Sequence, residues 1–103
     1  MKKIPLKTVT MTAPNGSEME LSYWTQLQSI MGAPMNTQGG LDVIEMRSSL
    51  RVMDALDLAG EEAEFFELED VDYDFMAGKV KGSKYLFAHE KLIQFIDDVT
   101  KVE

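Results

Sequence analysis

The stretch TVTMTAPNGSEMELS, residues 8–22, decides the fold class of this chain. Apolar side chains alternate with threonines before Pro14-Asn15-Gly16, and they alternate with acidic residues after it. Alternation with a period of two indicates half-buried strands, and Asn-Gly supplies the positive φ angles of a tight turn. The pattern predicts a β-hairpin over residues 6–22, in which residues 6–13 pair with residues 17–22.

Helical periodicity dominates the rest of the chain. In LDVIEMRSSLRVMDALDLAG, residues 41–60, apolar residues recur every three or four positions, and Gly60 follows the last turn. We predict a helix over residues 41–59 as the spine of the fold, with shorter helices at about 23–31, 70–81 and 89–101. The spacing predicts a core made of Val43, Ile44, Met46, Leu50, Met53, Leu56, Phe75, Val80, Leu92, Phe95 and Ile96.

These elements predict an α+β fold that is mainly helical. An N-terminal β-hairpin packs against three to four short helices, and the 103 residues form a single small domain. Residues 64–69, EFFELE, are too few for periodicity to classify. They fit either a brief third strand or an extended linker.

Composition excludes several classes of function. The chain contains no cysteine, which excludes disulfides and thiolate metal sites, and its net charge is −8. Phosphate backbones repel so acidic a chain, so we expect no binding to nucleic acid. No apolar run approaches the ~20 residues that span a bilayer, and the N-terminus lacks the apolar region of a signal peptide. We therefore expect a cytoplasmic protein without a membrane partner.

The segment from Asp57 to Asp74 is rich in acidic residues and contains no basic residue. The segment fits a solvated linker that leads into a helix, and it also fits an acidic surface that binds a basic partner or imitates nucleic acid. The candidate partner-binding residues are Glu61, Glu62, Glu64, Glu67, Glu69, Asp70, Asp72, Tyr73 and Asp74. We also expect Trp24 and Tyr73 to be exposed aromatic contributors to such a surface.

Aspartates at three alternate positions, 70, 72 and 74, look like the start of a calcium loop. An EF-hand loop needs glycine at its sixth position and glutamate at its twelfth, but Phe75 and Lys81 stand there. Aspartates are also favourable at the positive N-terminal end of a helix. We therefore predict a helix start, with no metal and no cofactor.

Catalytic signatures are missing from the sequence. His89 is the only histidine, no cysteine can partner it, and no serine lies in a G-x-S-x-G turn. We predict that the protein has no catalytic residues and is not an enzyme.

Several short motifs resemble a small family of tailed-phage and prophage proteins. The matching residues are Gly39-Gly40, Glu45-Met46-Arg47, Leu50-Arg51, Asp54-Ala55-Leu56, Glu67-Leu68-Glu69-Asp70, Asp72-Tyr73, Ile93, Phe95, Asp97 and Val99. The similarity covers the chain from about residue 6 to residue 100. It implies a late gene of the virion-assembly type, and it implies no reaction, cofactor or functional residue.

We therefore expect a non-enzymatic phage or prophage accessory or morphogenesis protein that acts by protein–protein contacts. The alternative is an acidic decoy that imitates nucleic acid and inhibits a host enzyme. The expected partner is a phage structural protein or a host protein, in the host cytoplasm or on the virion. Association into a homo-oligomer also stays open, because a hairpin offers a strand edge that can pair.

Overall fold

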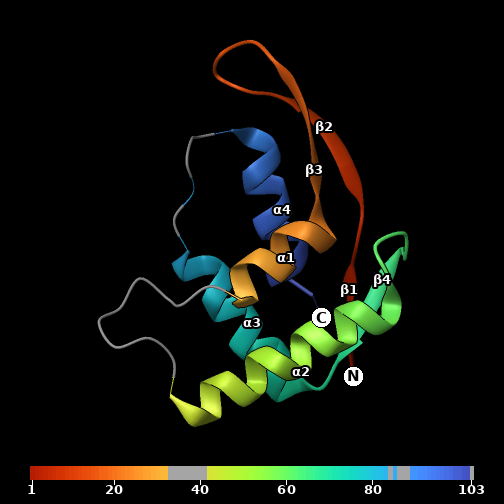
Figure 1. Cartoon of the computed structure of the whole chain (residues 1–103), viewed down its shortest axis with the longest axis vertical. Helices are drawn as coiled ribbons and strands as arrows, with labels where there is room; N and C mark the ends of the chain where they lie inside the picture. Colours follow the sequence, from red (N-terminus) through yellow and green to blue (C-terminus); the bar gives the residue numbers. More distant parts are fainter. Residues whose placement is uncertain (33–41, 84, 86–88, 103) are drawn as a thin grey trace.

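The computed structural model describes residues 1–32, 42–83, 85 and 89–102 (Figure 1). The elements in chain order are β1 (Lys2–Pro5), β2 (Thr8–Thr12), β3 (Glu18–Ser22), α1 (Tyr23–Gly32), α2 (Val43–Ala59), β4 (Phe65–Leu68), α3 (Asp70–Gly82) and α4 (Glu90–Thr100). The predicted α+β, mainly helical class is confirmed, and the helices begin and end close to the predicted positions. The first residue of the predicted 41–59 helix lies outside the described residues, as does Gly39-Gly40.

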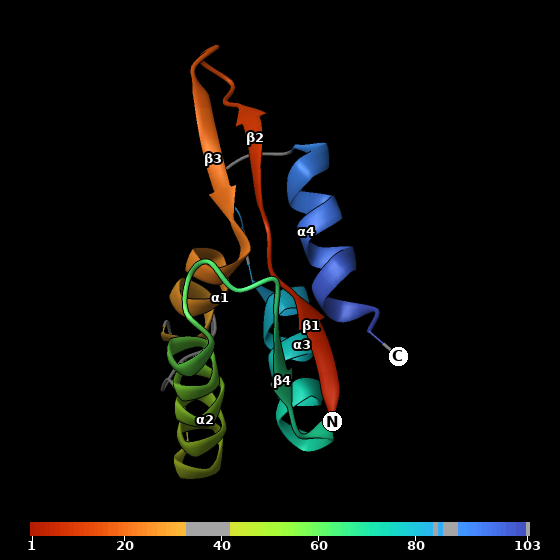
Figure 2. The same cartoon turned by 90° about the vertical axis from the view of Figure 1, so that its right-hand side faces the viewer.

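Strands β2 and β3 form the predicted hairpin, which projects from the body of the molecule beside α4 (Figures 1 and 2). Its register runs from Thr8 opposite Ser22 to the turn. Gly16 has a φ of 87°, a left-handed conformation that side chains with a Cβ rarely adopt. The Asn15 side chain accepts a hydrogen bond from the backbone N–H of Ser17 at 3.0 Å. Local turn chemistry therefore fixes the hairpin.

A second pair of strands joins the two halves of the sequence. Strand β1 pairs antiparallel with β4, and Ile4 lies opposite Phe66. Both side chains are buried, whereas Lys3 and Phe65 face outward and are exposed. Residues 64–69 thus contain a strand rather than a linker, and its partner β1 is a strand that the sequence did not indicate.

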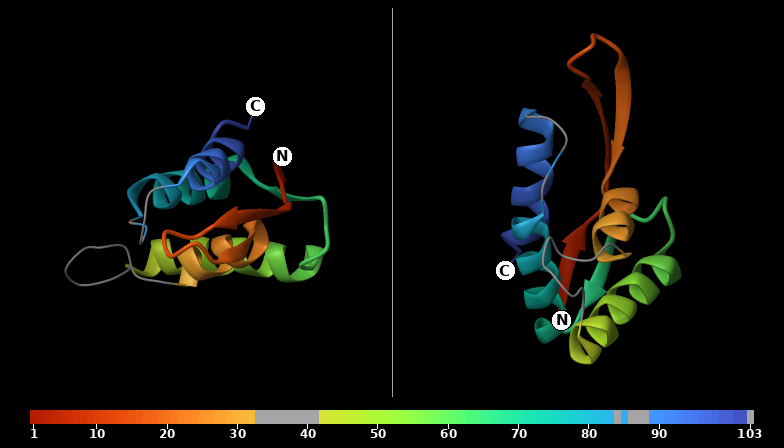
Figure 3. Two further views of the ribbon diagram at one scale, coloured as in Figure 1. Left: turned by 90° about the horizontal axis from the view of Figure 1, so that it is seen from above. Right: turned by 60° about the vertical axis from the view of Figure 1, so that its left-hand side comes forward.

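Helices lie on both sides of this strand pair. In the right panel of Figure 3, α1 and α2 lie on one side of β1 and β4, and α3 and α4 lie on the other; Figure 2 shows α2 and α4 on opposite sides of the strands. The two helical layers also meet, because α3 contacts both α1 and α2. The fully buried side chains with the largest volumes come from the four helices, β1 and β3: Tyr23, Phe95, Ile4, Leu21, Leu27, Met31, Leu56, Met76, Val52, Val80 and Val99.

The predicted core is correct for α3 and α4 and largely wrong for α2. Leu56, Val80, Leu92 and Phe95 are buried, and Met53, Phe75 and Ile96 pack partly buried against the core. However, the predicted core residues Val43, Ile44, Met46 and Leu50 are exposed. The buried face of α2 instead carries Ser48, Ser49, Val52 and Leu56. Arg51 binds both Ser48 and Asp72 of α3, so the less apolar stripe is the one that packs.

A buried lysine links α3 to the end of α1. The Lys79 side chain is almost fully buried, and its Nζ donates a hydrogen bond to the Met31 carbonyl at 3.0 Å. Carbonyls in the last turn of a helix lack intrahelical partners and carry partial negative charge, so a cation stabilises them. Burial lowers the pKa of Lys79 below its ordinary value, and the charge of Glu45 opposes that shift.

Candidate interaction surface

The acidic segment (residues 57–74) continues from the end of α2 through a turn and β4 into the first turns of α3. Seven of its predicted partner-binding residues are exposed: Glu61, Glu62, Glu64, Glu67, Glu69, Asp70 and Asp74. Asp70 lies in the first turn of α3, where a carboxylate is stabilised by the helix dipole. Glu67 lies on β4 and Asp70 and Asp74 lie on α3, whereas the other four lie in the connections between elements.

Asp72 was predicted to belong to the partner-binding surface, and this prediction is wrong. Its side chain points inward from α3 and is only 5% exposed as a residue. Both of its carboxylate oxygens accept hydrogen bonds from Arg51 of α2, at distances of 2.8 and 3.0 Å. This hydrogen bonding raises the pKa of Arg51 above its ordinary value. Asp72 thus joins two helices and does not face a partner.

The two aromatic residues proposed for the surface are also turned toward the protein. Tyr73 is buried, and its hydroxyl oxygen accepts a hydrogen bond from the backbone N–H of Val102 at 3.0 Å. Trp24 is half-buried, and its indole N–H donates to the Leu56 carbonyl at 2.8 Å. The expectation that these rings are exposed is therefore wrong, because each has a polar atom that binds the backbone of another element.

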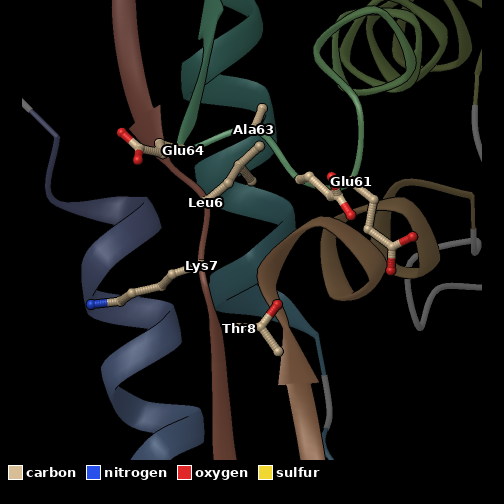
Figure 4. Close-up of a pocket in the computed structure, with 7 residues that line it drawn as sticks. Leu6, Lys7, Thr8, Glu61, Ala63 and Glu64 are labelled. Atoms are coloured by element: carbon tan, nitrogen blue, oxygen red, sulfur yellow. The ribbon is translucent and has the colours of Figure 1, made fainter.

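A broad hollow of about 600 Å³ lies between the turn after α2 and the chain that joins β1 to β2 (Figure 4). Glu61, Glu64 and Lys7 are among its lining residues, but their charged ends diverge. Lys7 extends toward α4, where its Nζ pairs with Asp98 at 3.1 Å. The charged groups that line the hollow therefore do not converge, so they do not form a common binding site.

Four large apolar side chains form a stripe along the outer side of the first half of α2. This α2 stripe consists of Val43, Ile44, Met46 and Leu50. Ile44 is 76% exposed, and the other three are about half exposed or more. Val43, Met46 and Leu50 share one helix face at i, i+3 and i+7, and Ile44 is exposed beside Val43. Grouped exposed apolar side chains of this size mark interaction sites on soluble proteins. The stripe that the sequence predicted as core is therefore a candidate contact surface.

A second apolar feature lies at the other end of α2. A groove of about 380 Å³ is lined by Met1, Ala55, Leu58, Ala59, Phe65, Phe66 and Glu67, which come from α2, from β4 and from the chain before β1. We call it the Leu58 groove. Leu58 is 91% exposed, and Met1 and Phe65 are exposed beside it. The small side chains of Ala55 and Ala59 leave the space between these larger ones.

Glu67 is the carboxylate in the lining of the Leu58 groove. Asp54 lies one turn before Leu58 on α2, whereas Asp57 accepts a hydrogen bond from the Gln28 side chain of α1 at 2.8 Å, and Glu61 and Glu62 line the broad hollow. In the described part of the chain, none of these five carboxylates forms an ion pair. Two positive charges lie nearby: the N-terminal ammonium of Met1, which lines the groove, and Lys3, which lies opposite Glu67 in the strand register and 4.8 Å from the centre of the Phe65 ring.

No metal-binding arrangement is found among the described residues. His89 is the N-cap of α4, where its Nδ1 accepts a hydrogen bond from the backbone N–H of Lys91 at 3.0 Å. Within these residues, no group of three or more histidine, aspartate or glutamate side chains is arranged to hold a metal ion. In the same ranges, no helix combines the length and apolarity needed to cross a membrane.

The exposed apolar residues of the Leu58 groove were not predicted from the sequence. Leu58 lies outside the apolar stripe of its helix and within a run of acids, from Asp54 to Glu62, in which no base occurs. A large apolar residue among so many acidic residues is the sequence feature that could have indicated an exposed apolar site. Met1 and Phe65 carried no comparable signal, because their position beside Leu58 depends on the pairing of β1 with β4.

Comparisons with protein-family models, with curated proteins and with solved structures found no match to this chain.

Proposed function

We propose that this chain is a non-enzymatic protein of a tailed phage or prophage that acts through protein–protein contacts in virion assembly or as an accessory factor. Its partner is a phage structural protein or a host protein. The observation that carries the binding role is the α2 stripe, Val43, Ile44, Met46 and Leu50, which is exposed although its spacing is that of a packed helix face. The phage context rests on the sequence motifs that resemble that family.

Burial of the α2 stripe against a partner would be energetically favourable. Burial of apolar surface contributes roughly 25 cal/mol per Å² removed from water, and large apolar side chains contribute most. An exposed helix face whose apolar side chains recur at i, i+3 and i+7 suits a partner helix or a partner groove. Acidic residues elsewhere on the surface would steer a basic partner and make its association rate depend on salt.

A tagged pull-down from cells in which the parent phage or prophage is induced tests this proposal. The matched bait is Leu50→Asp, which places a charge in the α2 stripe at an exposed position. We expect the wild-type bait to recover capsid, tail or tape-measure proteins and the variant to lose them. Recovery of the same proteins by both baits would contradict the role of the stripe. Recovery of no phage protein would contradict the assembly role.

The acidic decoy is the second candidate, and the ordered backbone of the acidic segment favours it. Glu67 lies on β4, and Asp70 and Asp74 lie on α3, so the backbone positions that carry these carboxylates are ordered, as the spacing of phosphates on a nucleic acid is. In the same pull-down, a decoy would recover a host nucleic-acid enzyme that elutes early in a salt gradient. Charge reversal at Glu67 and Asp74 would then abolish recovery, whereas Leu50→Asp would not.

A further inference from the structure

We propose that α2 pairs antiparallel with the α2 of a second copy of this chain through its outer face. The outer face consists of Val43, Arg47, Leu50, Asp54 and Leu58, which are all exposed. This inference rests on the proposed function, because it takes the α2 stripe to be a contact surface, and it adds that a second copy covers the stripe. A phage or host protein would then bind the dimer.

The outer face lies on one side of the helix, away from the core. An α-helix turns by about 100° per residue, so the five positions of the outer face fall within an arc of about 80°. The other two stripe residues, Ile44 and Met46, are exposed on either side of this arc. The buried residues of α2 lie on the opposite side of the helix: Ser48, Ser49, Val52 and Leu56. Figure 2 shows α2 at the edge of the molecule, where a second chain can reach it.

The order of side chains on the outer face is self-complementary. From either end it runs apolar, charged, Leu50, charged, apolar, and reversal of the helix exchanges the positive and the negative position. In an antiparallel pair centred beside Leu50, Arg47 of each copy therefore lies opposite Asp54 of the other, and Val43 lies opposite Leu58. A parallel pair would instead place like charges opposite each other, which costs affinity.

Arg47 and Asp54 are available for such a pair. They are seven positions apart, about 10 Å along the helix axis, so they cannot reach each other within one chain. In residues 1–32, 42–83, 85 and 89–102, neither of them forms an ion pair. The neighbouring charges of Arg51 and Asp57 already bind other helices, through Asp72 of α3 and Gln28 of α1. A second copy would give each of the two remaining charges an opposite partner.

The size of the face sets the expected strength of the dimer. Stable interfaces bury about 1,200–2,000 Å² in total. A pair of 17-residue helices, each about 25 Å long, is at or below the lower end of that range. The net charge of −8 on each chain also opposes association. We therefore expect a dimer that dissociates on dilution.

Sedimentation equilibrium of the whole chain, from ~10 μM to ~1 mM, tests the dimer. We expect a monomer–dimer equilibrium that Arg47→Asp and Asp54→Arg each weaken by at least about tenfold, because each brings like charges opposite each other. Asp74→Arg is the matched control, since it changes the net charge as Asp54→Arg does but at an exposed position of α3. It should not weaken the dimer. Circular dichroism and Tm would verify that these exposed variants fold.

Two recombinations of these variants test the antiparallel register. The double variant Arg47→Asp/Asp54→Arg swaps the two charges, so opposite charges face each other again and the dimer should be restored. An equimolar mixture of Arg47→Asp with Asp54→Arg should form a heterodimer, because one chain has acids at both positions and the other has arginines. Neither result follows from a change of net charge alone.

Three outcomes would overturn the inference: a chain that stays monomeric at ~1 mM, a dimer that Asp54→Arg leaves intact, and a double variant that does not recover association. If the chain is monomeric while the pull-down recovers phage proteins that Leu50→Asp loses, the proposed function stands and only the second copy is wrong. If the dimer forms as expected and no phage protein is recovered, the dimer stands and the assembly role fails.

Discussion

Arg51 and Asp72 join α2 to α3 by a bidentate ion pair. Nε of Arg51 lies 3.0 Å from each carboxylate oxygen, and Nη2 lies 2.8 Å from Oδ1. The same Nη2 donates to the Ser48 hydroxyl oxygen at 3.0 Å. Parallel donors in this geometry make arginine–carboxylate pairs more specific and stronger than neutral hydrogen bonds. The pair therefore holds the buried serine face of α2 against α3.

Loss of the Asp72 carboxylate should destabilise the fold without touching the proposed surface. Arg51 is partly exposed and can regain water, so we expect Asp72→Ala to lower the Tm by about 5 °C rather than unfold the chain. Asp74→Ala, an exposed carboxylate on the same helix, is the control and should leave the Tm nearly unchanged. Equal effects of both substitutions in thermal melts would contradict the role of the pair.

The orientation of α2 can be checked by two leucine truncations. Leu56 is fully buried, so Leu56→Ala should lower the free energy of unfolding by about 2–5 kcal/mol. Leu50 is 52% exposed, so Leu50→Ala should change it by less than about 0.5 kcal/mol. Urea titrations of both variants provide the measurement. A larger loss for Leu50→Ala than for Leu56→Ala would mean that α2 packs through the stripe predicted from its sequence.

Two glycines should respond to alanine with opposite signs. Gly78 is an exposed helical residue of α3, and an added Cβ would meet no atom within 4 Å. Because alanine loses less backbone freedom than glycine on folding, Gly78→Ala should raise the free energy of unfolding by about 0.5–1 kcal/mol. Gly16 has a φ of 87°, a conformation that is strained for any residue with a Cβ. Gly16→Ala should therefore lower the free energy of unfolding by roughly 1–2 kcal/mol. Chemical denaturation would compare both with the wild type.

The Tyr23 hydroxyl should contribute to stability in a pH-dependent manner. Tyr23 is buried, donates to Asp98 Oδ2 at 2.7 Å, and packs edge-on against Phe95. Tyr23→Phe keeps the ring and removes the hydrogen bond, so we expect a loss of about 1.5–3 kcal/mol at neutral pH. Tyr85→Phe removes a 3.2 Å bond to a carbonyl and should cost less.

The sign of that pH dependence follows from the pKa shift. Burial, and then the Asp98 carboxylate, raise the pKa of Tyr23 well above the ordinary value of 10.0. The unfolded chain ionises at that ordinary value while the folded chain stays protonated, so the contribution of Tyr23 is complete below pH 10.0 and falls as pH rises above it. Lys79, whose pKa is lowered, acts in the opposite direction, and its contribution changes as pH rises toward the ordinary value of 10.5.

Comparison of the wild type with Tyr23→Phe removes the contribution of Lys79, because both proteins contain it. The difference in unfolding free energy between them should therefore shrink from pH 9 to pH 11. A difference that stayed constant over this range, measured by urea titration at each pH, would contradict the raised pKa of Tyr23.

Local signals were sufficient for part of the fold. Asn15-Gly16 with its alternating flanks predicted the hairpin, and apolar periodicity with end signals such as Gly60 predicted the helices. Each of these signals acts over a few neighbouring residues. The pairing of β1 with β4 depends on residues far apart in the sequence, so no local pattern near Ile4 could reveal it.

The exposed surface was harder to predict, because burial depends on which neighbour a helix face meets. Helix α2 has two candidate stripes. The more apolar stripe is exposed, and the stripe with Ser48 and Val52 is buried. Asp72 of α3 binds α2 beside this buried stripe. The exposed carboxylates of the acidic segment could be recognised from composition. The inward turn of Asp72 and Tyr73 could not, since adjacent positions of a helix differ in facing by about 100° and only the packing decides which faces in.

The pairing of β1 with β4 also has a consequence for synthesis on the ribosome. Lys2 lies opposite Leu68 in the register, so β1 leaves the exit tunnel long before its partner has been translated. The hairpin that follows can close at once, because its two strands are joined by a short turn. Throughout that interval the edge of β1 and the Ile4 side chain stay uncovered and open to chaperones or to other nascent chains. We expect this strand to join the structure only when the chain has been translated past β4.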